Sequence, residues 1–174
     1  MDGEEEASSA RPRAGDQTED ATVTLPSGLR LDVEDEPSQE VVEALSWDLE
    51  GFNERRWPGH QPWKPLAVFA RDGERIVGGV AGETYAGWLF IRYLWVSDEL
   101  RGHGIGRRLM AAAEARAVER GSHSAFVDTF SFQAPVFYRK LGYETFGELD
   151  WSPDFKRYFL QKRLANASPA ARKS

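Results

Sequence analysis

The sequence contains no cysteine, and this absence excludes several kinds of chemistry. A chain without thiols forms no disulfide, holds no zinc through sulfur ligands and offers no cysteine nucleophile. No apolar run approaches the roughly 20 residues that a membrane-spanning helix needs, and the acidic N-terminus lacks the apolar segment of a secretory signal. We therefore expect a cytoplasmic protein with no membrane partner and no metal in its site.

A basic surface of the kind that binds nucleic acid is also missing. The chain has 28 acidic and 22 basic residues, for a formal net charge of −6. Most of that charge lies in residues 1–20, where seven acids face only Arg11 and Arg13. Acids and bases are mixed in the rest of the chain, so we expect no nucleic-acid partner.

Length and composition indicate one globular domain with short tails. A chain of 174 residues that is 41% hydrophobic is long enough to bury a core. Residues 1–20 have almost no large apolar side chain to offset their ordering entropy, so we expect a disordered acidic leader. Residues 21–164 are expected to form the domain, and residues 165–174 a disordered tail.

Turn residues and hydrophobic spacing divide this domain into strands and helices. Asp72-Gly73 between two apolar runs is a strong hairpin signal, and a third strand follows Gly87 after a short turn, so the three strands are antiparallel neighbours. Ser38 is a plausible N-cap for the first helix. One or two short edge strands are expected in 22–26 and 28–35. Further strands are expected at 66–70, 76–82, 88–96, 124–130, 143–149 and 157–164, helices from 38, 105 and 135, and a long loop at 51–65. This order predicts an α/β fold with a mixed, mostly antiparallel central sheet flanked by helices.

Three glycines lie between the strand at 88–96 and the helix that follows it. Gly102, Gly104 and Gly106 form a turn directly before the helix N-terminus. Such a turn exposes unpaired backbone N–H groups, which bind phosphate oxygens without a dedicated basic side chain. The stretch therefore predicts a nucleotide-type cofactor at residues 101–107.

Two common nucleotide motifs do not fit this turn. A dinucleotide fingerprint needs G-x-G-x-x-G in a βαβ unit, whereas the glycines here are spaced G-x-G-x-G after an antiparallel strand. A phosphate loop of the Walker type ends in Gly-Lys-Ser/Thr, but Gly106 is followed by Arg107.

A third pattern, Arg/Gln-x-x-Gly-x-Gly/Ala, is matched by Arg101, Gly104 and Gly106. A second block, SFQAPVFYRKLGY from Ser131 to Tyr143, keeps every position of the pattern Asn-x-x-Ala-x-x-x-Tyr followed by Leu-Gly-Phe/Tyr except the first. On these two blocks the chain resembles the GCN5-related N-acetyltransferase (GNAT) superfamily, over roughly residues 66–164. Serine in place of the first asparagine puts that one cofactor contact in doubt.

The resemblance implies the GNAT acyl-CoA acyltransferase fold, with acetyl-CoA as co-substrate. In such enzymes the glycine turn wraps the pyrophosphate, and the pantetheine lies where the preceding strand splays from its neighbour at a bulge. The implied cofactor contacts are Leu94, Val96, Arg101, Gly102, His103, Gly104, Ile105, Gly106, Arg107 and Ser131.

Acetyl transfer needs a neutral amine, a polarised thioester carbonyl and a proton for the departing thiolate. The resemblance implies the Val96 N–H as donor to the carbonyl and Tyr138 as general acid, although an aromatic residue in a short helix is also a common core residue. The base stays open: Glu83 and Asp128 are the candidate carboxylates, and each equally fits a solvated or hydrogen-bonded group. The lack of cysteine favours direct attack in a ternary complex.

The acceptor is expected to be a primary amine of a small molecule or a peptide. An aromatic pocket wall would suit an amphipathic amine, and the candidates for it are Phe52, Trp57, Trp63 and Trp88. His60, in the same predicted loop, reads as a solvated group or as part of the acceptor site. A non-catalytic acyl-CoA-binding or sensing domain is the alternative function, and a homodimer is the assembly common in the family.

Overall fold

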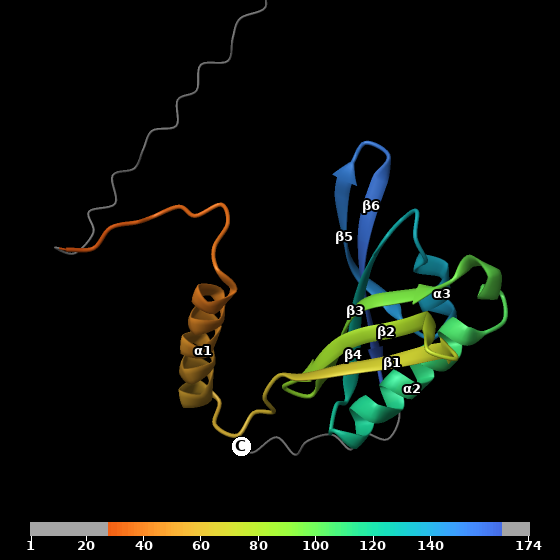
Figure 1. Cartoon of the computed structure of the whole chain (residues 1–174), viewed down its shortest axis with the longest axis horizontal. Coiled ribbons are helices and arrows are strands. Elements are labelled where there is room, and N and C mark those ends of the chain that lie inside the picture. The colour runs from red at the N-terminus through yellow and green to blue at the C-terminus, as the bar shows by residue number, and fades with distance from the viewer. Residues whose placement is uncertain (1–27, 165–174) are drawn as a thin grey trace, which may run out of the picture. The chain divides into compact units, whose positions relative to one another are not determined.

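The computed structural model describes residues 28–164 as a series of strands and helices (Figure 1). They fall into two compact units, one ending at Leu45 and one starting at Ser46, and the sheet lies in the second. The elements are α1 (Gln39–Arg56), β1 (Lys64–Asp72), β2 (Arg75–Tyr85), β3 (Trp88–Val96), a 3-10 turn (Asp98–Leu100), α2 (Ile105–Glu119), β4 (Ser124–Phe130), α3 (Pro135–Lys140), β5 (Glu144–Ser152) and β6 (Phe155–Arg163). Within the described range, no helix has the length and apolar character needed to cross a membrane.

Helix α1 begins where the sequence predicts and ends later. The Val41 N–H donates to the Ser38 Oγ at 3.3 Å, which confirms Ser38 as the N-cap. The predicted loop at 51–65 is wrong for its first residues, because α1 continues to Arg56. A single glycine, Gly51, costs a helix only about 1 kcal/mol, whereas Pro58 ends it.

Two further predictions concern the segment before α1. The strand predicted at 28–35 is wrong, because residues 28–35 form no strand. Alternating side chains alone do not make a strand, which also needs a hydrogen-bonded neighbour. The strand predicted at 22–26 and the domain boundary at residue 21 lie outside the described residues.

The sheet has six strands in the order β1-β2-β3-β4-β6-β5. Strands β1, β2 and β3 are antiparallel neighbours, as the hairpin signal predicts, and β4, β6 and β5 also pair antiparallel. Among the strands of residues 28–164, only β3 and β4 are parallel neighbours, because α2 connects them as a crossover. The predicted mixed, mostly antiparallel sheet is confirmed.

One face of the sheet packs against α2, which contacts β1, β2 and β3. Ala113 and Ala117 of α2 are fully buried, so this predicted small-residue face lets the helix lie close to the strands. Leu89 and Ile91 of β3 are buried in the same core. Because side chains alternate along a strand, Phe90 points to the opposite face.

Strands β3 and β4 separate after a few residues of pairing. Their ladder ends at Ile91 and Val127, while both strands continue beyond it. Arg92 is an extra residue in β3, since Ile91 pairs with Gly82 of β2 and Tyr93 pairs with Ala81. This bulge bends β3, and the two halves of the sheet run in different directions (Figure 1). The predicted splay is therefore present.

Candidate active site

A pocket of about 850 Å³ lies where β3 and β4 separate. Its walls come from β3, the glycine turn, the start of α2, the second half of β4 and α3. The lining residues that the argument uses are Arg92, Leu94, Val96, Arg101, Asp128, Thr129, Gln133 and Tyr138. The strand that the glycine turn follows and the helix that carries Tyr138 thus meet at one cavity.

The glycine turn has the geometry of a phosphate cradle. Gly102 and Gly104 have φ angles of 82° and 77°, in the left-handed region that other residues rarely adopt. No atom lies within 4 Å of the position of a Cβ on either residue, so the space before the turn is open. The turn fits the pyrophosphate of acetyl-CoA because its backbone has room to approach a ligand closely.

The first turn of α2 supplies donors to the same place. Gly104 is the N-cap and has no side chain to cap the helix. The first helical hydrogen bond runs from the Arg108 N–H to the Gly104 carbonyl, at 3.1 Å. The N–H groups of residues 105–107 therefore have no helical partner, and all three residues line the pocket.

Most of the predicted cofactor contacts line this pocket. These are Leu94, Val96, Arg101, Gly102, Gly104, Ile105, Gly106 and Arg107. His103 is not among the lining residues, and its Nδ1 lies 3.0 Å from the Arg101 carbonyl. Ser131 also lies outside the lining, because its Oγ accepts a hydrogen bond from the Lys156 N–H at 3.2 Å and so ties the end of β4 to β6.

Tyr138 lies on the pocket wall and is 6% exposed. Burial, together with the negative charge of Asp128, raises the pKa of its hydroxyl to about 12. Its ring contacts the rings of Phe137 and Tyr143 edge-on, with centroids 5.3 and 5.8 Å away. The phenol is thus held by packing and keeps its proton at neutral pH.

The turn before α3 is built by a small hydrogen-bond network. The buried Thr129 hydroxyl donates to the Gln133 Oε1 at 3.2 Å, and the Phe130 N–H donates to the same oxygen at 2.9 Å. The Ala134 N–H in turn donates to the Thr129 Oγ1 at 3.5 Å. These contacts fix the start of the helix that carries Tyr138.

The two candidate carboxylates differ in their relation to the pocket. Asp128 lines it and is paired with Arg157, whose Nε and Nη2 each lie 2.7 Å from the Asp128 Oδ2. Glu83 is outside the lining, and its Oε1 accepts from the Nε of Arg92, a lining residue, at 2.6 Å. Asp128 is therefore the carboxylate that the structure brings closest to the reaction space.

Tyr138 and Asp128 approach the pocket from opposite faces of the sheet. Val127 and Thr129 are buried on the side of α2 and α3, so Asp128 between them points to the other face. Tyr138 belongs to the core on the α2 side. The pocket consequently passes through the opening between β3 and β4.

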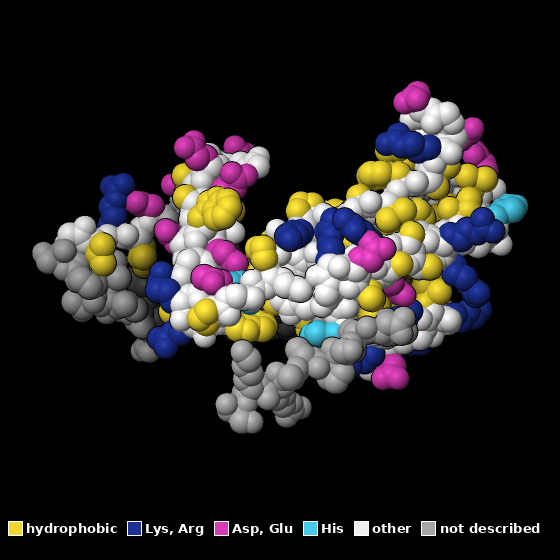
Figure 2. Space-filling view, turned by 90° about the horizontal axis from the view of Figure 1, so that it is seen from below, with side chains coloured by type: hydrophobic (Ala, Val, Ile, Leu, Met, Phe, Trp, Pro, Cys, Tyr) yellow, Lys and Arg dark blue, Asp and Glu magenta, His cyan; other side chains and the backbone are white. Residues whose placement is uncertain are grey.

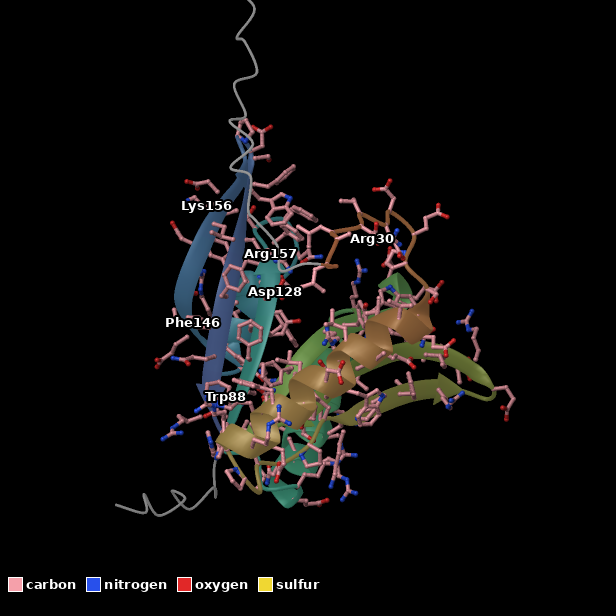
Figure 3. All side chains as sticks on the ribbon, turned by 90° about the vertical axis from the view of Figure 1, so that its left-hand side faces the viewer. Arg30, Trp88, Asp128, Phe146, Lys156 and Arg157 are labelled. Atoms are coloured by element: carbon pink, nitrogen blue, oxygen red, sulfur yellow. The ribbon has the colours of Figure 1, made fainter. Side chains whose placement is uncertain are left out.

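The four predicted acceptor-wall residues do not line this pocket. Trp88 lies at the start of β3, near the His123 ring and in a separate pocket of about 410 Å³, away from Asp128 along the strands (Figure 3). Phe52 carries the Arg56 guanidinium over its ring, and Trp57 stacks on His60. Trp63 stacks on Tyr85 with centroids 4.1 Å apart.

Trp63 nevertheless begins a row of aromatic rings that leads toward Asp128. We call Trp63, Tyr85, Phe90, Phe126 and Phe159 the aromatic row. Centroid distances are 5.4 Å from Trp63 to Phe90, 5.9 Å from Phe90 to Phe126 and 6.4 Å from Phe126 to Phe159. Phe159 is the β6 residue paired with Asp128.

His60 is buried, which corrects the expectation of a solvated loop residue. Its side chain is 1% exposed, with Nε2 2.7 Å from Glu50 and Nδ1 3.1 Å from Glu54. The Trp57 carbonyl, 2.9 Å from Nδ1, and then Glu50 raise the pKa of His60. Both ring nitrogens thus face acceptors, and the doubly protonated ring satisfies them.

Arg92, Gln133 and Arg157 were not identified from the sequence as site residues. Only the bulge distinguishes Arg92 from its neighbours, and no local sequence pattern predicts that bulge. The spacing of Thr129 and Gln133 across a turn is a weak local signal of their hydrogen bond. Arg157 reaches Asp128 from 29 positions away in the chain, so no local pattern could have indicated it.

Charged side chains on the molecular surface are mixed in sign. On the face shown in Figure 2, groups of Lys and Arg lie beside Asp, Glu and apolar side chains.

Comparisons with known proteins agree with this site. The model of the acetyltransferase (GNAT) domain matches residues 64–145. A blasticidin-S acetyltransferase of Streptomyces morookaense is 41% identical over 107 residues, 58% of this chain and 79% of the relative. The crystal structure of an acetyltransferase from Bacillus cereus is 31% identical, with a TM-score of 0.67 over 76% of this chain and 98% of that chain.

A further solved structure shares the fold. A Bacillus anthracis protein described as a streptothricin acetyltransferase, in complex with acetyl coenzyme A, shares the fold at 20% identity. Its TM-score is 0.52, over 63% of this chain and 66% of that chain. The chain belongs to the GCN5-related N-acetyltransferase (GNAT) family and is an N-acetyltransferase that uses acetyl-CoA.

Proposed function

We propose that the protein acetylates a primary amine of a small molecule by direct attack in a ternary complex. The observation that carries this proposal is the pocket through the sheet, with Tyr138 on one face and Asp128 on the other. Two substrates that enter from opposite faces would meet between these side chains.

Acetyl-CoA, when bound, supplies an activated thioester. The N–H groups of residues 105–107 and the glycine turn would hold its pyrophosphate. Beyond Ile91, the edge of β3 that faces β4 has no strand partner in the described sheet, so the backbone N–H groups of Leu94 and Val96 are the proposed contacts to the thioester arm. The Val96 carbonyl accepts a hydrogen bond from the Arg101 Nε at 3.2 Å. The Val96 N–H is the proposed donor to the thioester carbonyl.

Tyr138 is the proposed general acid. A departing thiolate needs a proton, and the phenol keeps its own at neutral pH because burial raises its pKa to about 12. No hydrogen bond to the Tyr138 hydroxyl is found from residues 28–164, so the proton is free to be donated to a ligand in the pocket.

Asp128 is the proposed group that receives the amine. A primary amine is mostly protonated at neutral pH and must lose a proton before it attacks. A carboxylate at the pocket wall both attracts the ammonium and accepts its proton, directly or through a water. Glu83, which Arg92 holds on the same face of the sheet as Asp128, is the second candidate for this role.

The acceptor class follows from the surface that leads to Asp128. The aromatic row offers a flat apolar surface with few polar groups that a peptide could bind. Such a surface suits an amphipathic small molecule better than a charged peptide. The relative from Streptomyces morookaense is named for a small molecule, blasticidin S, which supports this choice.

The test is release of free CoA thiol from acetyl-CoA in the presence of candidate acceptors. Blasticidin S, aminoglycosides, polyamines and short peptides form the panel, and each product is checked by mass for one added acetyl group. We expect at least one small-molecule amine to accelerate thiol release. Acetyl-CoA binding without acceleration by any amine of the panel would contradict the proposed acceptor, and acceleration by peptides alone would overturn the acceptor class.

A further inference from the structure

Arg157 occupies an unusual environment for a charged residue at a pocket edge. Its guanidinium carbon lies 5.2 Å from the ring centroid of Trp151, 5.3 Å from that of Phe130 and 5.8 Å from that of Phe159. The side chain is 31% exposed. Three rings from β4, β5 and β6 therefore restrict the guanidinium to one place.

Arg157 binds one of the two carboxylate oxygens of Asp128. Nε and Nη2 both lie 2.7 Å from the same oxygen, Oδ2. No hydrogen bond to the other oxygen, Oδ1, is found from residues 28–164. One carboxylate oxygen is thus fixed by the arginine while the second keeps its lone pairs for a ligand.

The location of the pair in the sheet makes this arrangement relevant to the reaction. Asp128 is the first β4 residue after the ladder with β3 ends at Val127, so it stands where the opening begins. Arg157 reaches it from the neighbouring strand β6, and both are labelled in Figure 3.

We propose that Arg157 is a positioning residue that acts through Asp128 to orient the acceptor amine. This inference rests on the proposed function, because it needs Asp128 to receive the amine. Arg157 itself is outside the pocket lining and touches no reacting atom. Its effect is to hold Oδ2 so that Oδ1 is presented to the amine in one geometry.

The expected signature is a loss of catalytic efficiency toward the acceptor, with no loss in acetyl-CoA binding. With Arg157→Gln, the carboxylate rotates freely, and a misplaced catalytic group costs up to about 10²-fold in rate. We expect kcat/KM for the acceptor to fall roughly 10- to 100-fold, with acetyl-CoA affinity unchanged. Arg157→Lys, which keeps the charge but not the paired donors, is expected to recover part of the loss.

A double-mutant cycle separates this role from a structural one. If Arg157 acts through Asp128, adding Arg157→Gln to Asp128→Asn changes kcat/KM by no more than about twofold, because the partner is already disabled. Independent, multiplicative losses, or no loss in Arg157→Gln alone, would overturn the inference. Should Arg157→Gln not fold, Arg157→Lys is combined with Asp128→Asn in the same cycle.

Lys156→Gln is the matched control. Lys156 is the residue before Arg157 in β6 and pairs with Glu148 at 2.8 Å. Lys156→Gln removes the same charge, so the kcat/KM of this variant should stay at the wild-type value. Failure of the proposed function is distinguishable: wild-type protein that releases no thiol with any amine contradicts that function. An active wild type with an unaffected Asp128→Asn variant would contradict both the role of Asp128 and this inference.

Discussion

Tyr138 has a buried ring that neighbouring rings orient, and a hydroxyl whose raised pKa keeps it protonated. Removing only its oxygen, as Tyr138→Phe, leaves the ring packing intact and deletes the proton source. We expect kcat to fall roughly 10²- to 10⁴-fold, the usual contribution of a general acid. Steady-state thiol release at saturating substrates measures this change.

Tyr143→Phe is the control for that substitution. Tyr143 is buried nearby, and its hydroxyl donates to Glu114 at 3.0 Å instead of facing the pocket. Its loss should lower stability by about 1–3 kcal/mol and leave the turnover of the folded enzyme unchanged. Equal turnover in wild type and Tyr138→Phe would exclude Tyr138 as the acid.

Gly104 tests whether the glycine turn is a cofactor cradle. Alanine at φ 77° costs roughly 1–2 kcal/mol of backbone strain and displaces the donors at the start of α2. We expect about tenfold weaker acetyl-CoA binding, equivalent to about 1.4 kcal/mol, by calorimetric titration.

Gly73→Ala provides the comparison for Gly104→Ala. Gly73 also has a positive φ, 56°, with no atom within 4 Å of a Cβ, but it lies in the β1–β2 hairpin. It should lose similar stability without any change in acetyl-CoA affinity. Equal affinities for the two variants would argue against the cradle.

At the scale of single residues, the sequence identifies site residues where the function requires a given residue type within a local pattern. The glycines and Tyr138 belong to such patterns, and the structure places them at one pocket. Asp128 was one of two carboxylates that the sequence could not rank, because ranking them depends on which one lines the pocket, and that is set by strand pairing. Arg157 is invisible to local patterns, since its partner lies on another strand.

At the scale of elements, His60 joins the end of α1 to the sheet. Its ring pairs with Glu50 and Glu54 of α1 and meets the Tyr85 ring of β2 edge-on, with centroids 5.3 Å apart. Glu50 and Glu54 thus face an imidazole whose pKa is raised above its ordinary value, so His60 is protonated more readily in the folded protein than in the unfolded chain.

This contact makes stability depend on pH. Because the folded-state pKa of His60 is raised above its ordinary 6.5, the stabilisation is complete below pH 6.5 and is lost as the pH rises through the folded-state value. We expect the urea midpoint of wild type to fall between pH 5.5 and pH 8.5 by more than that of His60→Gln. An identical decrease in both proteins would contradict the assignment.

The elements themselves were predicted with uneven success, and the reasons are physical. The β1–β2 hairpin and α2 were located correctly because Asp-Gly turns and small-residue periodicity are local signals. The end of α1 was predicted too early, because Gly51 reads as a helix breaker although one glycine is tolerated. The bulge at Arg92 was expected only from the family resemblance, since it depends on pairing with β2.

At the scale of the whole sheet, the opening between β3 and β4 is the feature on which the account depends. A parallel pair that stops after four residue pairs leaves a passage between the faces. The cofactor turn and Tyr138 lie on the α2 side of this passage, and Asp128 and the aromatic row on the other. The proposed direct transfer requires both substrates to be bound at once across this passage, and the sequence offers no cysteine thiol to carry the acetyl group.

Initial-rate kinetics test this central claim most directly. Velocities of thiol release are measured while acetyl-CoA and an accepted amine are varied together. Direct transfer across the opening predicts intersecting lines in double-reciprocal plots, and no thiol release from acetyl-CoA in the absence of the amine. Parallel lines, with an acetyl group found on the protein after incubation with acetyl-CoA alone, would contradict the account.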